Sequence, residues 1–126
     1  MTDDEVSMKL KNILIVVNDI EVSKAFYRDL FGLQVVTDFG ENVILSEGLV
    51  LQERKTWEEF TKKEVVSYVN TFELYFEEYD LESFIDKLEK SSYKIEYVNE
   101  LNKEEWGKRA IRIYDPDGHI IEVGDK

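Results

Sequence analysis

The sequence predicts an α+β domain made of two successive βαβββ modules. Two observations support this prediction. A strand-like run, an aspartate and an amphipathic helix follow one another twice, and the two aspartates, Asp19 and Asp80, lie 61 positions apart. Short strand-like runs then follow each helix. Two halves of about 50 residues with the same order of elements indicate a structural repeat, although few residues are identical.

The first module is predicted over residues 9–54. Residues 10–17 (LKNILIVV) are rich in β-branched side chains and nearly continuous in apolar ones, which predicts a strand buried on both faces. A helix follows, with Asp19 as its N-cap and Gly32 at its end. The apolar helix positions are Val22, Phe26 and Leu30, and the strand candidates are LQVVTD, NVILS and LVLQER, with Gly40 and Gly48 in the turns.

The second module is predicted over residues 68–124, after a charged connector at 55–67 that accommodates a short helix. The run NTFELYFEE alternates between apolar and polar residues, which places Glu73 and Tyr75 on the face opposite Leu74. Asp80 then caps a helix whose apolar positions recur at helical spacing. Those positions are Leu81, Phe84, Ile85 and Leu88, and the strand candidates YKIEYV, AIRIYD and HIIEV complete the module.

Length and composition predict one globular domain over residues 1–126 and narrow its partners. The apolar fraction of 43% is too high for a disordered acidic chain. A net charge of −12 disfavours nucleic acid and anionic membrane surfaces, because phosphates need a basic patch. The chain has no cysteine, the N-terminal residues lack the apolar core of a signal peptide, and the longest aliphatic run is ILIVV. We therefore expect a cytoplasmic protein.

The C-terminal stretch DPDGHIIEVG combines a turn with a candidate site residue. Pro116 and Gly118 fit positions i+1 and i+3 of a type I turn, and His119, the single histidine, is expected to be a hairpin residue rather than a catalyst. Glu122 alternates with Ile121 and Val123. The alternation predicts that Glu122 leaves the helix-packed side of its sheet, as Glu73 does.

Three stretches together resemble the vicinal oxygen chelate superfamily, which includes glyoxalase I, bleomycin-resistance proteins and extradiol dioxygenases. They are ILIVVNDIEVSKAFYRDLFGLQVV, FELYFEEYDLESFIDKL and YDPDGHIIEV. The resemblance covers residues 9–124. It implies that the strands curve into a cup with helices outside, that a small molecule binds inside the cup between the two modules, and that chains pair as homodimers. Because this scaffold hosts many chemistries, the resemblance does not name a reaction.

The resemblance also implies where a divalent metal would be held. Carried over residue by residue, the four ligand positions fall on Asn12, Gln52, Glu73 and Glu122, with Glu53 as the alternative to Gln52. Metal-binding relatives usually have histidine at one or two of these positions, and none is present here. An all-oxygen set favours Mg²⁺, Mn²⁺ or Ca²⁺ over Zn²⁺ or Ni²⁺.

Glu73 and Glu122 are in addition the candidates for moving a proton, and Tyr75, Trp57 and Trp106 are the candidates for contacting a ligand. If the two glutamates share a cup without a cation, they should repel each other. On that premise Glu122→Gln is expected to stabilise the metal-free protein near neutral pH.

Three functions remain open from the sequence. The first is a metal-free binding or sequestering protein of the bleomycin-resistance type, whose excess of acid would suit a cationic ligand. The second is a divalent-metal-dependent lyase, isomerase or dioxygenase, which is the role of glyoxalase I and its relatives. The third is a regulatory or assembly module without catalysis. In each case the partners expected are a small molecule and a second copy of the chain.

Overall fold

The protein is described by a computed structural model that covers residues 7–103 and 108–126. The first module contains β1 (Ile13–Val17), α1 (Ile20–Phe31), β2 (Val35–Asp38), β3 (Asn42–Leu45), the 3-10 turn η2 (Ser46–Gly48) and β4 (Leu49–Glu53). The connector contains α2 (Arg54–Thr61). The second module contains β5 (Leu74–Glu78), α3 (Leu81–Lys90), β6 (Glu96–Lys103), β7 (Arg109–Tyr114) and β8 (Ile120–Asp125).

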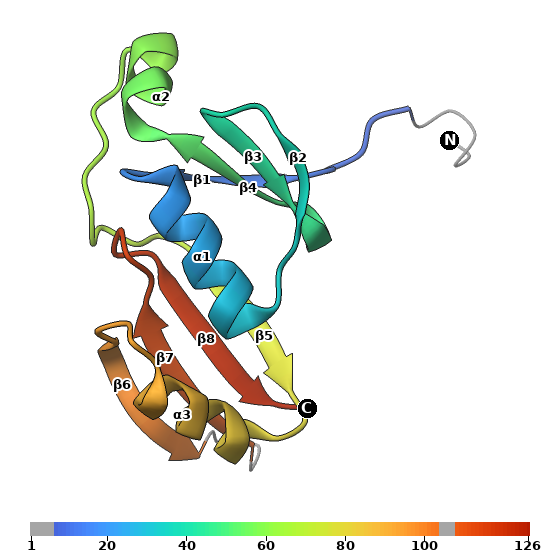
Figure 1. The fold of residues 1–126 in the computed structure, drawn as a ribbon, viewed down its shortest axis with the longest axis vertical. Coiled ribbons are helices and arrows are strands. Elements are labelled where there is room, and N and C mark those ends of the chain that lie inside the picture. The colour runs from blue at the N-terminus through green and yellow to red at the C-terminus, as the bar shows by residue number, and fades with distance from the viewer. Residues whose placement is uncertain (1–6, 104–107) are drawn as a thin grey trace.

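Each module forms a four-stranded mixed sheet of the same topology (Figure 1). The strand order is β1-β4-β3-β2 in the first sheet and β5-β8-β7-β6 in the second. In each sheet the first and last strands of the module pair in parallel, and the other neighbours are antiparallel. The prediction of an α+β protein with two βαβββ modules is confirmed.

Both long helices begin at the predicted N-caps. The Asp19 carboxylate accepts hydrogen bonds from the backbone N–H groups of Glu21 and Val22, and Asp80 accepts one from Ser83. These bonds satisfy amides that lack a partner within the helix. Gly32 ends α1 in the left-handed conformation, at a φ of 70°. Val22, expected in the buried stripe, is largely exposed.

The strand β1 is shorter than predicted and is not buried on both faces. It starts at Ile13, and its residues alternate between buried Ile15 and Val17 and exposed Leu14. The continuous apolar run suggested a strand covered on both sides, as in a parallel sheet between two helix layers. Here α1 covers one face of β1. The apolar residues on the other face, such as Leu14, are therefore not explained by a second layer of helices.

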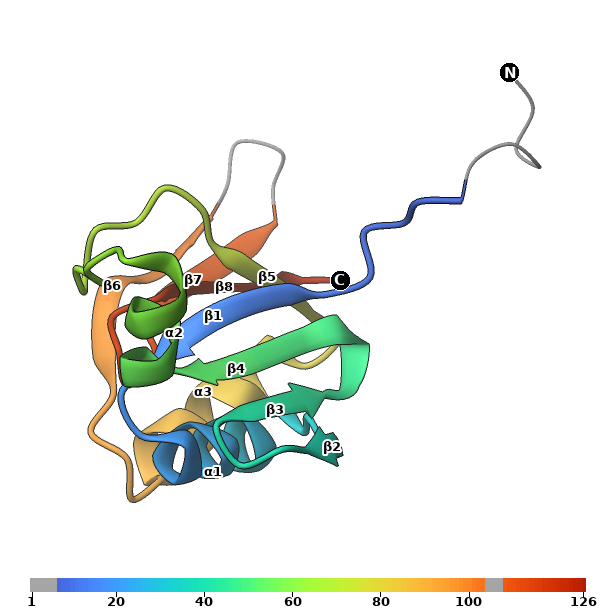
Figure 2. The same ribbon diagram turned by 90° about the horizontal axis from the view of Figure 1, so that it is seen from above.

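The helices of both modules lie against one shared core. The ring of Phe31 in α1 lies 4.6 Å from that of Phe76 in β5 and 5.5 Å from that of Phe84 in α3. Fully burying a ring such as that of Phe84 contributes about 1.5–3 kcal/mol, and the partly buried rings of Phe31 and Phe76 contribute less. Buried residues of both sheets, for example Ile15 of β1 and Ile121 of β8, belong to the same hydrophobic cluster. The face of each sheet that lies away from this core is called its outer face below (Figure 2).

The turn between β7 and β8 ties the second module to the first. The Tyr27 hydroxyl donates to Asp115 Oδ2 at 2.6 Å, and the Asn18 backbone N–H donates to Asp117 Oδ1 at 2.9 Å. His119 Nε2 lies 2.8 Å from the Val16 carbonyl oxygen, to which it donates. The predicted turn is present, since Gly118 N–H bonds the Asp115 carbonyl at 3.1 Å. We call Asp115, Asp117 and His119 with these partners the module joint.

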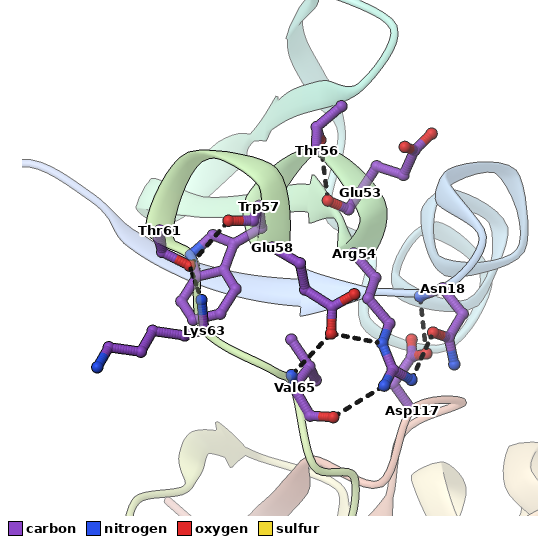
Figure 3. Close-up of polar contacts among 10 residues, drawn as sticks. All are labelled: Asn18, Glu53, Arg54, Thr56, Trp57, Glu58, Thr61, Lys63, Val65 and Asp117. Atoms are coloured by element: carbon purple, nitrogen blue, oxygen red, sulfur yellow. Dashed lines mark hydrogen bonds and ion pairs between the residues drawn. The ribbon is translucent and has the colours of Figure 1, made fainter.

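The connector is fastened to the same region by Arg54 of α2 (Figure 3). Arg54 Nη2 donates to the Val65 carbonyl at 2.8 Å, and its Nε donates to Glu58 Oε2 at 3.3 Å. Glu58 Oε2 also accepts from the Val65 N–H at 2.8 Å. Arg54 Nη1 reaches Asn18 Oδ1 at 3.5 Å, so α2 and the segment after it are anchored beside the end of β1.

None of the helices in the described ranges has the length and apolar character needed to cross a bilayer.

Candidate functional site

Glu73, Arg112 and Glu122 form a charged cluster on the outer face of the second sheet. Arg112 Nη2 lies 2.7 Å from Glu122 Oε1, and Arg112 Nε lies 3.2 Å from Glu73 Oε1. The three residues come from β7, β8 and the residue that precedes β5. One guanidinium therefore bridges carboxylates that are 49 positions apart in the sequence.

The strand register explains why these side chains meet. Glu122 pairs with Arg112 of β7 on one side and with Tyr75 of β5 on the other. Paired residues in neighbouring strands point to the same face, and residues two apart along a strand share that face. Glu73, two positions before Tyr75, thus faces the same way. The predicted juxtaposition of Glu73 and Glu122 agrees with this register.

Within the cluster the pair of Glu122 and Arg112 is the part best screened from water, although it lies on the face away from the helix core. The Glu122 side chain is 10% exposed, that of Arg112 is 26% and that of Glu73 is 35%. A buried carboxylate needs a cation or several donors to remain charged. Arg112 supplies the cation for Glu122, and Glu73 is the more accessible of the two acids.

Tyr75 covers the neighbouring part of the same face. A Cβ built on Gly124 of β8 would lie 2.7 Å from the Tyr75 hydroxyl oxygen, so the ring can lie against β8 only because position 124 is glycine. Roughly half of Tyr75 remains exposed, beside the charged cluster. An aromatic ring next to convergent polar groups is typical of small-molecule sites.

The two other aromatic candidates are placed differently. Trp57 is half-buried on α2, near the end of the first sheet (Figure 3). Its carbonyl accepts a hydrogen bond from Thr61 at 2.9 Å. Trp106 lies outside the described residues.

Asn12 and Gln52 do not form a pair in the first sheet. Gln52 pairs with Val16 in the parallel β1–β4 register, whereas Asn12 lies beside Gly48. The separation of four residues corresponds to about 13 Å along the strand, at roughly 3.3 Å per residue. The register therefore does not bring Asn12 and Gln52 together, and their assignment to one ion remains a prediction of the resemblance.

Gln52 also bonds protein neighbours through both ends of its amide. Its Oε1 accepts from Asn42 Nδ2 at 2.7 Å, and its Nε2 donates to Thr56 Oγ1 at 2.7 Å. Thr56 belongs to α2, which covers this end of the outer face of the first sheet. The alternative residue, Glu53, is the N-cap position of α2.

The four expected metal ligands consequently do not fit a divalent ion in this chain. Gln52 is bonded to Asn42, Glu73 and Glu122 are bonded to Arg112, and Asn12 lies far along the strand. Among the described residues, no group of three or more histidine, cysteine, aspartate or glutamate side chains is arranged to hold a metal. This arrangement of the four residues supports no metal-dependent chemistry.

Arg112 is the site residue that sequence reasoning missed, and it overturns one expectation. The proposed repulsion between Glu73 and Glu122 assumed that no cation lies between them, but Arg112 contacts both. Glu122→Gln is therefore no longer expected to stabilise the protein. The signal was available in the run RAIRIY, because Arg112 alternates with Ile111 and Ile113 and thus shares the outer face of Glu122.

A groove of about 680 Å³ lies apart from the charged cluster. It separates the start of β1 from β5 and from the C-terminal part of α1. Its lining is apolar and aromatic, with charged residues of both signs at its edge, namely Glu47, Glu77, Glu78, Lys87 and Lys126. Among the predicted site residues that the structure describes, Tyr75 borders it.

Two βαβββ modules around a shared helical core, with a charged cluster on the outer face of one sheet, define a small α+β protein built from a structural repeat. The family model of the glyoxalase-like domain matches residues 10–126. The chain therefore belongs to the glyoxalase-like family, as the resemblance predicted.

Individual relatives extend this result. The chain is 30% identical over 125 residues to the uncharacterized protein YraH of Bacillus subtilis (strain 168). The alignment covers 92% of this chain and 97% of that protein. A crystal structure of a protein of unknown function from Agrobacterium tumefaciens is 33% identical, with a TM-score of 0.81 and 96% of each chain covered. A glyoxalase-related enzyme from Fulvimarina pelagi shares the fold at 21% identity, with a TM-score of 0.79 and 94% and 88% covered.

Proposed function

We propose that this protein binds a small organic molecule on the outer face of its second sheet, at the cluster of Glu73, Arg112 and Glu122 beside Tyr75. The observation that carries the proposal is the ion pair between Arg112 and Glu122, which is screened from water on a face that the helix core leaves uncovered. Such a pair stabilises a fold little compared with apolar residues of the same volume. A binding role gives a reason for polar groups to converge there.

The charge of the site favours a ligand with a positive group. The cluster holds two carboxylates and one guanidinium, and the whole chain carries −12. Glu73 is the accessible acid, and the Tyr75 ring beside it offers a face for a cation or an aromatic group. Sequestration of a cationic organic molecule agrees with these features and requires no metal.

We further propose that two copies of the chain complete the site. The outer faces of the two sheets point away from the shared core, so a cup needs a sheet from a second copy opposite each of them. Exposed apolar residues support this pairing, since Leu14 lies on an outer face and residues 7–12 leave the body as an arm (Figure 1). Met8 and Leu10 of that arm are each 87% exposed, which is unfavourable for a solitary chain.

The ligand proposal is tested by a thermal-shift screen of small amines, guanidines and aromatic cations in the presence of a chelator. A ligand at 100 times its Kd raises stability by about 2.7 kcal/mol. The shift should vanish in Glu73→Gln and Tyr75→Ala and persist in Arg109→Gln, a control on the same sheet. Ligands whose shift is equal in all variants would place binding elsewhere and refute the proposed site.

The assembly proposal is tested by sedimentation velocity at micromolar concentration. The wild-type chain should sediment as a dimer, and Leu14→Glu, which places a charge on the outer face, should shift it toward the monomer. A single 14.9 kDa species for the wild type would contradict the proposal.

A further inference from the structure

Arg112 occupies a position between two carboxylates where a divalent ion would otherwise be expected. Its Nη2 and Nε atoms approach one oxygen each of Glu122 and Glu73, at 2.7 Å and 3.2 Å. The carboxylates come from different strands, and β8 lies between β5 and β7 in the sheet. Arg112 thus extends across β8 to hold the acid at the start of β5 together with the acid on β8.

We infer that Arg112 is the built-in cation of this site: its guanidinium joins Glu73 and Glu122 and thereby closes the site to divalent metal ions. The inference concerns the site of the proposed function, but it depends on the described contacts and not on any ligand.

Electrostatics explains why a metal would not displace the guanidinium. A divalent ion bound by Glu73 and Glu122 would lie next to Arg112, whose side chain is 26% exposed. A divalent ion and a guanidinium side by side repel each other strongly in a partly desolvated site. Displacement would also remove two charge-assisted hydrogen bonds, which are about twice as strong as neutral ones.

The donor chemistry leads to the same conclusion. A hard ion such as Mn²⁺ or Mg²⁺ needs about six oxygen ligands, and the described neighbours supply two carboxylates already used by Arg112. Arginine, unlike lysine, cannot lose its proton to make way for a metal at any ordinary pH. The exclusion should therefore hold across the whole pH range in which the protein is folded.

The test compares the full chain with R112A, E122Q and the double variant R112A/E122Q. R109A is the matched control, because Arg109 lies on the same strand and also bridges two carboxylates, Glu82 and Asp125, at a more exposed position. Melting temperatures are measured from pH 5 to 8 with chelator, with 5 mM Mn²⁺ and with 20 mM ethylguanidinium. Binding of Mn²⁺ is measured separately by electron paramagnetic resonance.

The wild type should melt alike with chelator and with Mn²⁺ and should bind no stoichiometric Mn²⁺ at Glu122. R112A should melt about 5–10 °C lower at pH 8, because Glu122 is left without its cation. Ethylguanidinium or Mn²⁺ should recover part of the loss in R112A and none in R112A/E122Q or R109A.

Two results would overturn the inference. One is a wild-type protein that takes up one Mn²⁺ per chain at micromolar concentration and loses it in E122Q. The other is an R112A variant that neither cation restores, which would leave Arg112 a purely structural residue. If R112A does not fold, the Mn²⁺ titration of the wild type against E122Q decides by itself. The Mn²⁺ titration uses no organic ligand, so that its failure is distinct from failure of the ligand screen.

Discussion

The protein contains two clusters of carboxylates, each with at least one buried acid, that are stabilised in different ways. In the module joint, Asp115 and Asp117 are satisfied by neutral donors, namely backbone N–H groups and the hydroxyls of Tyr27 and Ser23. On the outer face of the second sheet, Glu122 is held by the charge of Arg112. The joint uses its acids to fix one module against the other, whereas the outer face keeps a pair of opposite charges near the surface.

In the module joint, burial also shifts the pKa values of two titratable groups, Asp117 and Tyr27. Burial raises the pKa of Asp117 above its usual range, and the nearby charge of Asp115 acts in the same direction. The hydrogen bond from the Asn18 N–H and the charge of His119 oppose this shift without cancelling it. Burial likewise raises the pKa of the Tyr27 phenol well above its ordinary value, so Tyr27 remains a donor to Asp115.

The largest effect is expected from Asp115→Ala in the joint. Asp115 accepts hydrogen bonds from the Tyr27 hydroxyl and from the backbone N–H groups of Asp117 and His119. Removing the carboxylate leaves these buried donors without a partner, which should cost about 3–4 kcal/mol of unfolding free energy. Urea denaturation measures the loss. Asp86→Ala, at an exposed position of α3, is the control and should change little; equal losses in both variants would contradict the assigned role.

A smaller effect that depends on pH is expected from Asp117→Asn. Since the pKa of Asp117 is raised in the folded protein, the wild type is more stable below the unfolded value of about 3.9 and loses that contribution as pH rises through the folded value. Asparagine does not titrate. The stability of the variant relative to the wild type should therefore improve from pH 4 to pH 7. Thermal unfolding at both values checks this, and an unchanged difference would rule it out.

The smallest effect is expected from Arg109→Gln on the same strand as Arg112. Arg109 bonds Asp125 and Glu82 at a more exposed end of the sheet, where water and salt screen charge pairs. Its melting temperature should fall by less than about 2 °C, and the difference should fade in 0.5 M salt. A loss as large as that from removing Arg112 would show that burial does not distinguish the two arginines.

The helices and turns of the two modules could be predicted from the sequence, because the residues that begin and end them act on their near neighbours. The N-caps Asp19 and Asp80, the glycine that ends α1 and the turn DPDG act within a few residues, and each is found where it was predicted. The alternation of each strand likewise placed Glu73 and Glu122 away from the helix-packed side. These features depend on neighbours along the chain and can be read without knowing the packing.

Which side chains come into contact across the sheet depends on the tertiary structure and could not be predicted from the sequence. The pairing of Arg112 with Glu122 depends on the register between β7 and β8, and the bridge to Glu73 depends on the strand order. The register of β1 on β4 likewise separates Asn12 from Gln52, a distance that residue types do not reveal. A one-residue change in register turns every side chain to the other face, so the identity of the cation at this site is a property of the assembled sheet.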